Sequence, residues 1–226
     1  MNARANQDGD VRPRTAAFVA GIALLLMAVI APLASFGVVG NLSISGDAAA
    51  TAANLAQSAG AVRLAATGLM VVVILDIIVA WSLFVVLRDK NHSLSLLGAW
   101  FRLVYAATFP IAIANLFRAA LTAGSSPEQA VLFLDSFNLM WQVSLFVFSF
   151  HLLTVGVLVW RPGVVEKVLG ALLLLAGAGY LIDGLGAMID PSYDLGISAF
   201  TFTGEVLFII WLFARGGKNR PAMTAE

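Results

Sequence analysis

The sequence contains no cysteine, only two histidines and few charged residues. The lack of cysteine excludes disulfides, thiol catalysis and cysteine-ligated metals, and two histidines are too few for a histidine cage. Charged residues make up 12% of the chain and hydrophobic residues 60%, whereas soluble domains are about a quarter charged. The 13 basic residues are balanced by 13 acidic ones, which leaves no basic surface for nucleic acid. The composition therefore argues against a soluble enzyme and indicates an integral membrane protein.

Long apolar runs account for the mean hydropathy of +0.92. A bilayer core about 30 Å thick needs about 20 helical residues, and six runs reach about that length. They predict an all-α transmembrane bundle with six spans, forming a single membrane domain over 15–214 between tails at 1–14 and 215–226. The spans are expected at about 15–39, 62–87, 93–121, 137–160, 164–188 and 196–214.

Lysine and arginine are distributed unevenly between the two sides of these spans. Ten fall in the two tails and in the connections after spans 2 and 4, whereas only Arg63 and Arg118 lie near the opposite connections. Basic residues accumulate in cytoplasmic segments. We therefore expect both termini in the cytoplasm, and the protein in the cytoplasmic membrane.

The connection at 43–60 is long enough to hold structure of its own. Ser45-Gly46-Asp47 can cap a helix through the alanine-rich run that follows, which predicts a short helix over about 46–59 on the outer surface. This helix is either a spacer or a lid over an outward-facing cavity. Asp47, Asn54 and Arg63 are the candidates for an outer entrance.

Glycines recur every seven residues in the fifth span, at Gly170, Gly177 and Gly184, and again at Gly179 and Gly186. This spacing keeps each series on one helix face, where small residues let a neighbouring helix approach. The pattern predicts close helix packing.

Five ionisable side chains interrupt the apolar runs, where a charge costs roughly 2.5–3.5 kcal/mol on insertion scales. Asp76, Arg102, His151 and Glu205 lie in four different spans, each ten to twelve residues from the expected cytoplasmic boundary. At 1.5 Å per residue this depth is about 15–18 Å, so the four share one layer near the midplane. Asp183 lies about 24 Å from that boundary, near the outer surface.

The layer predicts partners for its charges. Spans 2 and 3 form a hairpin, so Asp76 is expected to pair with Arg102, which can engage a carboxylate by two parallel hydrogen bonds. With a neutral His151, the remaining Glu205 leaves one net negative charge, which protonation of either group removes. Arg102 argues against a bound cation in the layer, so no metal and no cofactor is predicted.

Three functions remain open. The favoured one is small-molecule binding or proton-linked transport, in which His151 and a carboxylate exchange a proton. The second is an intramembrane enzyme or metal site that uses Asp76, His151 and Glu205; it is less favoured because the chain lacks a Walker loop and the His-Glu-x-x-His and Gly-x-Ser-x-Gly motifs. The third is a structural protein or partner subunit whose buried charges only fix helix packing. Expected partners are the lipid bilayer and a small molecule or a proton, and a homo-oligomer stays open.

An ordered set of segments resembles a known family of membrane proteins. The set is Gly46–Asn54 with Arg63-Leu64, Asp76, Phe101-Arg102-Leu103, His151, Gly179-Tyr180-Leu181-Ile182-Asp183 and Gly204-Glu205. Together, over about residues 15–214, they resemble the DUF4386 family of uncharacterised bacterial integral membrane proteins. The resemblance implies a small multi-pass protein of a bacterial membrane, and it implies no activity.

Overall fold

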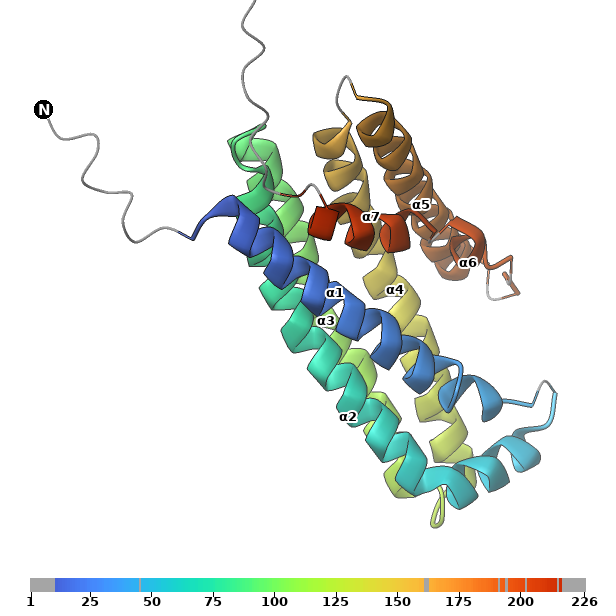
Figure 1. Ribbon diagram of the computed structural model, residues 1–226. Coiled ribbons are helices and arrows are strands. Elements are labelled where there is room, and N and C mark those ends of the chain that lie inside the picture. The colour runs from blue at the N-terminus through green and yellow to red at the C-terminus, as the bar shows by residue number, and fades with distance from the viewer. Residues whose placement is uncertain are drawn as a thin grey trace, which may run out of the picture.

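The structure is a computed structural model that describes residues 11–44, 46–160, 163–190, 192–193, 195–201, 203–214 and 216. Most of the two expected tails, and Ser45, Arg161 and Asp194, lie outside these ranges. Within the ranges every regular element is helical (Figure 1). The elements are α1 (Pro13–Ser35), the 3-10 helix η1 (Val39–Asn41), α2 (Ala48–Leu87), α3 (His92–Thr122), α4 (Pro127–Val159), α5 (Val164–Ile189), α6 (Ser198–Thr201) and α7 (Thr203–Ala214).

Among the described residues, five helices, α1 to α5, are long and apolar enough to cross a membrane. Within the expected sixth span at 196–214 the structure describes α6 and α7, and the 12 residues of α7 are about 18 Å long. The protein is therefore an all-helical membrane protein with five long helices and a shorter apolar one.

The helix expected on the outer surface is the first part of α2 rather than a separate element. Asp47 caps it by accepting a hydrogen bond from the Ala50 N–H at 2.8 Å. Residues 48–59 contain no glycine or proline, so nothing in that run ends the helix before it enters the membrane span. Figure 1 shows that this cyan part of α2 lies at a steep angle to the rest of the helix.

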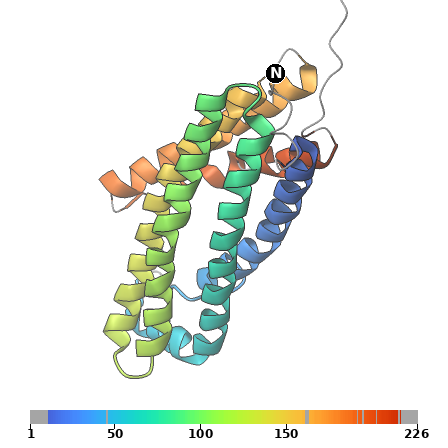
Figure 2. The ribbon, with the colours of Figure 1, turned by 90° about the vertical axis from the view of Figure 1, so that its left-hand side faces the viewer.

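The helices form a ring. Each of α1 to α5 packs against the next, α5 packs against α7, and α7 packs against α1. Figure 2 shows α2 and α3 side by side along the bundle, and α2 also contacts α4 across the ring. Because the ring closes through α7, residues from α2, α3, α4 and α7 can meet in its interior.

Glycines set the distance between α4 and α5. A Cβ atom on Gly170 would lie 2.9 Å from the Gly156 carbonyl oxygen, and one on Gly177 would lie 3.0 Å from the Leu153 nitrogen. Gly184 meets Phe146 of α4 in the same way, so the series 170, 177, 184 faces α4. Gly179 instead faces Thr201 of α6. The predicted packing role is confirmed, and the two series serve different neighbours.

Candidate functional site

An ion pair between α2 and α3 lies at the centre of the charged layer. Nη2 of Arg102 is 2.6 Å from Oδ1 of Asp76, and the two side chains are only 3% and 0% exposed. The pairing expected from the hairpin is thus present. Only one carboxylate oxygen takes part in it, because the second terminal nitrogen of Arg102 is turned toward α4.

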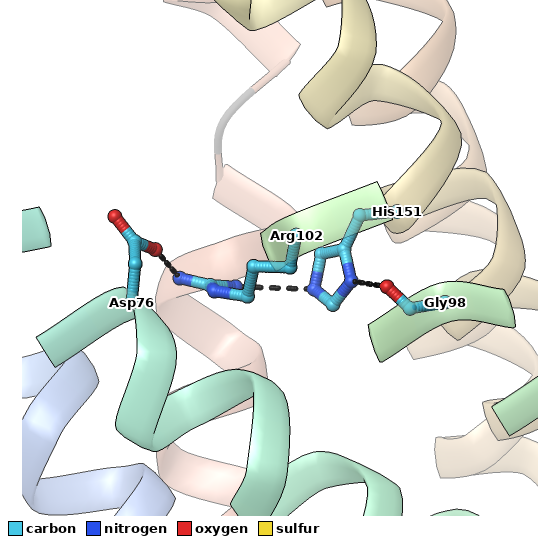
Figure 3. Close-up of polar contacts among 4 residues, drawn as sticks. All are labelled: Asp76, Gly98, Arg102 and His151. Atoms are coloured by element: carbon cyan, nitrogen blue, oxygen red, sulfur yellow. Dashed lines mark hydrogen bonds and ion pairs between the residues drawn. The ribbon is translucent and has the colours of Figure 1, made fainter. Parts of the chain in front are cut away.

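The second terminal nitrogen of Arg102 is hydrogen-bonded to His151 of α4 (Figure 3). Nη1 of Arg102 lies 3.1 Å from Nε2 of His151, and Nδ1 of the same ring lies 2.8 Å from the Gly98 carbonyl oxygen. A guanidinium group has only donors and a carbonyl has only acceptors. His151 must therefore donate through Nδ1 and accept at Nε2, so the ring is neutral in this arrangement.

This geometry gives His151 a role that sequence reasoning did not foresee. A proton on Nε2 would place an N–H group against an N–H group of Arg102, and the contact would become repulsive. The histidine connects the guanidinium to the backbone of α3 and orients it toward Asp76. In this arrangement neither ring nitrogen of His151 is free to bind a further proton.

Aromatic side chains surround the guanidinium group. Arg102 lies over the ring of Phe148 at 5.2 Å, a favourable cation–π distance. Phe148 contacts Tyr105 and Tyr180, with ring centroids 5.0 and 5.7 Å apart. Phe148 stands three residues before His151 and Tyr105 three after Arg102, so helical spacing from the charged residues is the signal that points to them.

Glu205 lies in the first turn of α7 and is half-buried. Its carboxyl group is beside the Tyr180 hydroxyl of α5 and close enough to Arg102 and Asp76 for the charges to interact. The ionisable groups that were predicted to share one depth therefore also lie close to one another in the folded protein. It places two carboxyl groups, those of Asp76 and Glu205, around the single guanidinium of Arg102.

Asp183 belongs to a separate network at the other end of α5. Its Oδ1 accepts from the Tyr193 hydroxyl at 2.8 Å and from the Ile197 N–H at 2.9 Å, and its Oδ2 accepts from the Ser198 N–H at 2.7 Å. These bonds anchor the start of α6 to α5.

Two groups beside this network have shifted pKa values. Burial is the main cause that raises the pKa of Tyr193, and its hydrogen bond to Asp183 raises it further. Hydrogen bonds from Ser192 lower the pKa of Asp190.

The three candidates for an outer entrance lie along the first half of α2. Asp47 is the helix cap already described, and the Asn54 amide donates to the Leu42 carbonyl oxygen at 3.3 Å. Arg63 is exposed. Asp47 and Asn54 thus shape the connection between α1 and α2, and a lid function stays a prediction.

A metal centre would need at least three ligating side chains close together. Within the part of the chain that the structure describes, no such group of histidine, aspartate and glutamate residues occurs. Nδ1 of His151 carries the proton that it donates to the Gly98 carbonyl oxygen, and the lone pair on Nε2 accepts from Arg102, so the ring directs no lone pair toward a cation.

The close approach of Gly98 on α3 to Thr154 on α4 supports a first prediction. A Cβ atom on Gly98 would lie 3.0 Å from Cγ2 of Thr154 on α4. Gly98→Ala should therefore push the two helices apart and lower the free energy of unfolding by about 1–3 kcal/mol, measured by thermal unfolding in detergent.

The matched control is Gly98→Ala combined with Thr154→Ser. Serine removes the obstructing methyl group and keeps the hydroxyl, which donates to the Phe150 carbonyl oxygen. This double variant should regain most of the lost stability. A double variant as unstable as Gly98→Ala alone would contradict the proposed contact.

The ring of apolar helices with charged groups held inside it defines a multi-pass helical membrane protein. The chain belongs to the DUF4386 family, a domain of unknown function whose family model matches residues 19–216. The resemblance noted in the sequence is thereby confirmed.

The comparisons also show a relative outside bacteria. An uncharacterised protein of Archaeoglobus fulgidus is 34% identical over 151 residues, which cover 67% of this chain and 83% of that protein. No solved structure matches the chain.

Proposed function

We propose that this protein binds or transports a small molecule in a proton-linked manner, and that Glu205 is the group that exchanges the proton. The observation that carries the proposal is the charge balance of the layer. Asp76 balances the positive charge of Arg102 in an ion pair, and the neutral His151 adds no charge. Glu205 is then the carboxyl group in excess, and a proton is the smallest species that removes its charge from an apolar interior.

The position of Glu205 supports this assignment. It lies on α7, a shorter apolar helix of the ring, beside a tyrosine hydroxyl that can accept or donate a hydrogen bond. A change in its protonation alters the attraction between α7 and Arg102. Proton binding is thereby linked to the packing of α7 against the other helices.

We also propose that the protein resides in the cytoplasmic membrane with both termini in the cytoplasm. The start of α1, the turn between α2 and α3 and the start of α5 lie at the same end of the bundle (Figure 1). Arg12, Arg14, Arg88, Lys90 and Lys167 belong to these segments. This distribution agrees with the positive-inside rule.

Infrared difference spectroscopy of the full chain in lipid, between an acidic and a neutral buffer, tests the proton exchange. The wild type is expected to show the C=O band of a carboxyl group that becomes protonated, and Glu205→Gln should remove it without unfolding the protein. Glu128→Gln changes an exposed glutamate in the first turn of α4 and should leave that band unchanged. An unchanged band in Glu205→Gln would contradict the assignment.

The link to a ligand is tested by thermal stabilisation with a panel of small solutes at both pH values. A proton-linked ligand should shift the Tm of the wild type by an amount that depends on pH. In Glu205→Gln the shift should lose its pH dependence. A pH-dependent shift of equal size in the variant would exclude Glu205 as the linked group.

A further inference from the structure

An arginine takes part in the contact that closes the helix ring. The guanidinium of Arg14, in the first turn of α1, donates from Nη1 to the carbonyl oxygens of Leu212 at 3.0 Å and Gly216 at 2.9 Å. Its Nη2 donates to the Phe213 carbonyl oxygen. The carbonyls of Leu212 and Phe213 lie in the last turn of α7, where a helix leaves its last carbonyl groups without partners, and Gly216 follows the helix. Arg14 thus connects residues about 200 positions apart in the chain.

The surface of α1 around Arg14 is shaped to receive the end of α7. Arg14 also lies over the ring of Phe18 at 4.4 Å, and Phe18 contacts Phe213 edge to face. A Cβ atom on Gly21 would lie 2.8 Å from the Phe213 ring, so glycine leaves the space that this ring occupies. The contact combines directional hydrogen bonds with a fitted ring and can therefore form and break as one unit.

The other attachments of α7 lie at its beginning and toward its end. Gly204 brings α7 against the backbone of Leu172 on α5, and a Cβ atom there would lie 2.7 Å from that carbonyl oxygen. Toward its end, α7 is held by Arg14 and by Lys90, whose ammonium lies 5.2 Å from the Trp211 ring. Along α7, Glu205 lies between these two points of attachment.

From these contacts we infer that α7 is a movable gate in the helix ring and that Arg14 is the latch that keeps it closed. When Arg14 releases the three carbonyl oxygens, the end of α7 separates from α1 and the interior at Glu205 opens toward the end of the bundle where Arg14 lies. The gate controls access to the interior whether or not Glu205 exchanges a proton.

The absence of cysteine from the chain allows a direct test. Ile209 lies one turn after Glu205 on the same face of α7 and is 8% exposed, so Ile209→Cys places a single thiol in the closed interior. Its reaction with a membrane-impermeant maleimide is measured on the full chain in liposomes. Adding Arg14→Gln should raise the rate at least about tenfold, the factor for losing one hydrogen bond to a charged group.

Two controls separate opening from general damage. Arg12→Gln removes the same charge from an exposed arginine two residues earlier and should leave the rate of Ile209→Cys unchanged. Arg14→Lys keeps the charge but lacks the planar guanidinium that reaches several carbonyls, so it should give an intermediate rate. Should Arg14→Gln lose its helical circular dichroism, Arg14→Lys carries the test.

A crosslink provides a second readout. A Cβ atom on Gly216 would lie 2.9 Å from Cβ of Ala17, so cysteines at both positions are within disulfide reach when the gate is closed. Adding Arg14→Gln to this pair should slow disulfide formation, and Arg12→Gln should not. Labelling and crosslinking rates that are the same with Arg14→Gln as with Arg12→Gln would overturn the latch.

Neither readout requires a proton or solute flux. Failure of the latch would therefore leave the proposal for Glu205 standing. Failure of the infrared test would likewise leave the latch standing.

Discussion

Replacing Arg102 with methionine is expected to lower the free energy of unfolding by about 3–5 kcal/mol. The substitution leaves the carboxylate of Asp76 inside the bundle without its counter-charge, and removing one partner of a buried ion pair has an effect of this size. Asp76 is 0% exposed and its Oδ2 has no hydrogen-bond partner among the described residues, so no neighbour replaces the lost pair. Unfolding by SDS titration in mixed micelles measures the change.

The double variant Asp76→Leu with Arg102→Met should regain most of this loss, because apolar residues often replace a buried ion pair without a net loss of stability. Recovery should remain incomplete by about 1 kcal/mol, since Nε2 of His151 loses its donor. A double variant no more stable than either single variant would contradict the pairing.

The same single and double variants test whether the ion pair serves packing or ligand binding. If the double variant folds as well as the wild type and retains a pH-dependent ligand effect, the ion pair serves packing alone. Loss of that effect in a well-folded double variant places Asp76 and Arg102 in the binding machinery with Glu205. The two outcomes distinguish a purely structural role of the ion pair from a role in ligand binding.

The second large effect is expected at the contact between α4 and α5. Gly170→Leu should lower the free energy of unfolding by about 3 kcal/mol, at the upper end of the range for overpacked sites. A Cβ atom on this residue would lie 2.9 Å from the Gly156 carbonyl oxygen and 3.0 Å from Cα of Trp160. Both are backbone atoms, which cannot rotate away, so the helices themselves must separate. The same SDS titration measures the loss.

Gly60→Leu is the matched control for this prediction. Gly60 also lies within a helix, but a Cβ atom there meets nothing within 4 Å. Leucine is a better helix former than glycine by about 0.5–1 kcal/mol, so the control should be neutral or slightly stabilising. Equal losses at the two positions would show that the effect of Gly170→Leu does not come from the contact with α4.

Local features of the sequence were sufficient for the class of protein and for much of the charged layer. Apolar runs of bilayer length specify helices wherever they occur, because the backbone in lipid must satisfy its own hydrogen bonds. The 1.5 Å rise per residue places Asp76, Arg102, His151 and Glu205 at similar depths before any contact is known. The short connection between two spans was enough to predict that Asp76 pairs with Arg102.

Only the tertiary structure decided how these groups are used. His151 is neutral because two particular atoms, Nη1 of Arg102 and the Gly98 carbonyl oxygen, meet its ring from another helix. The start of α6 is likewise held by Asp183 of α5, which accepts hydrogen bonds from the N–H groups of Ile197 and Ser198. Arg14 counted only as a basic residue of the tail until the fold brought the end of α7 to it. Periodicity along one helix determines depth and face, whereas contacts between helices depend on crossing angles and on side chains distant in the chain, which no local pattern encodes.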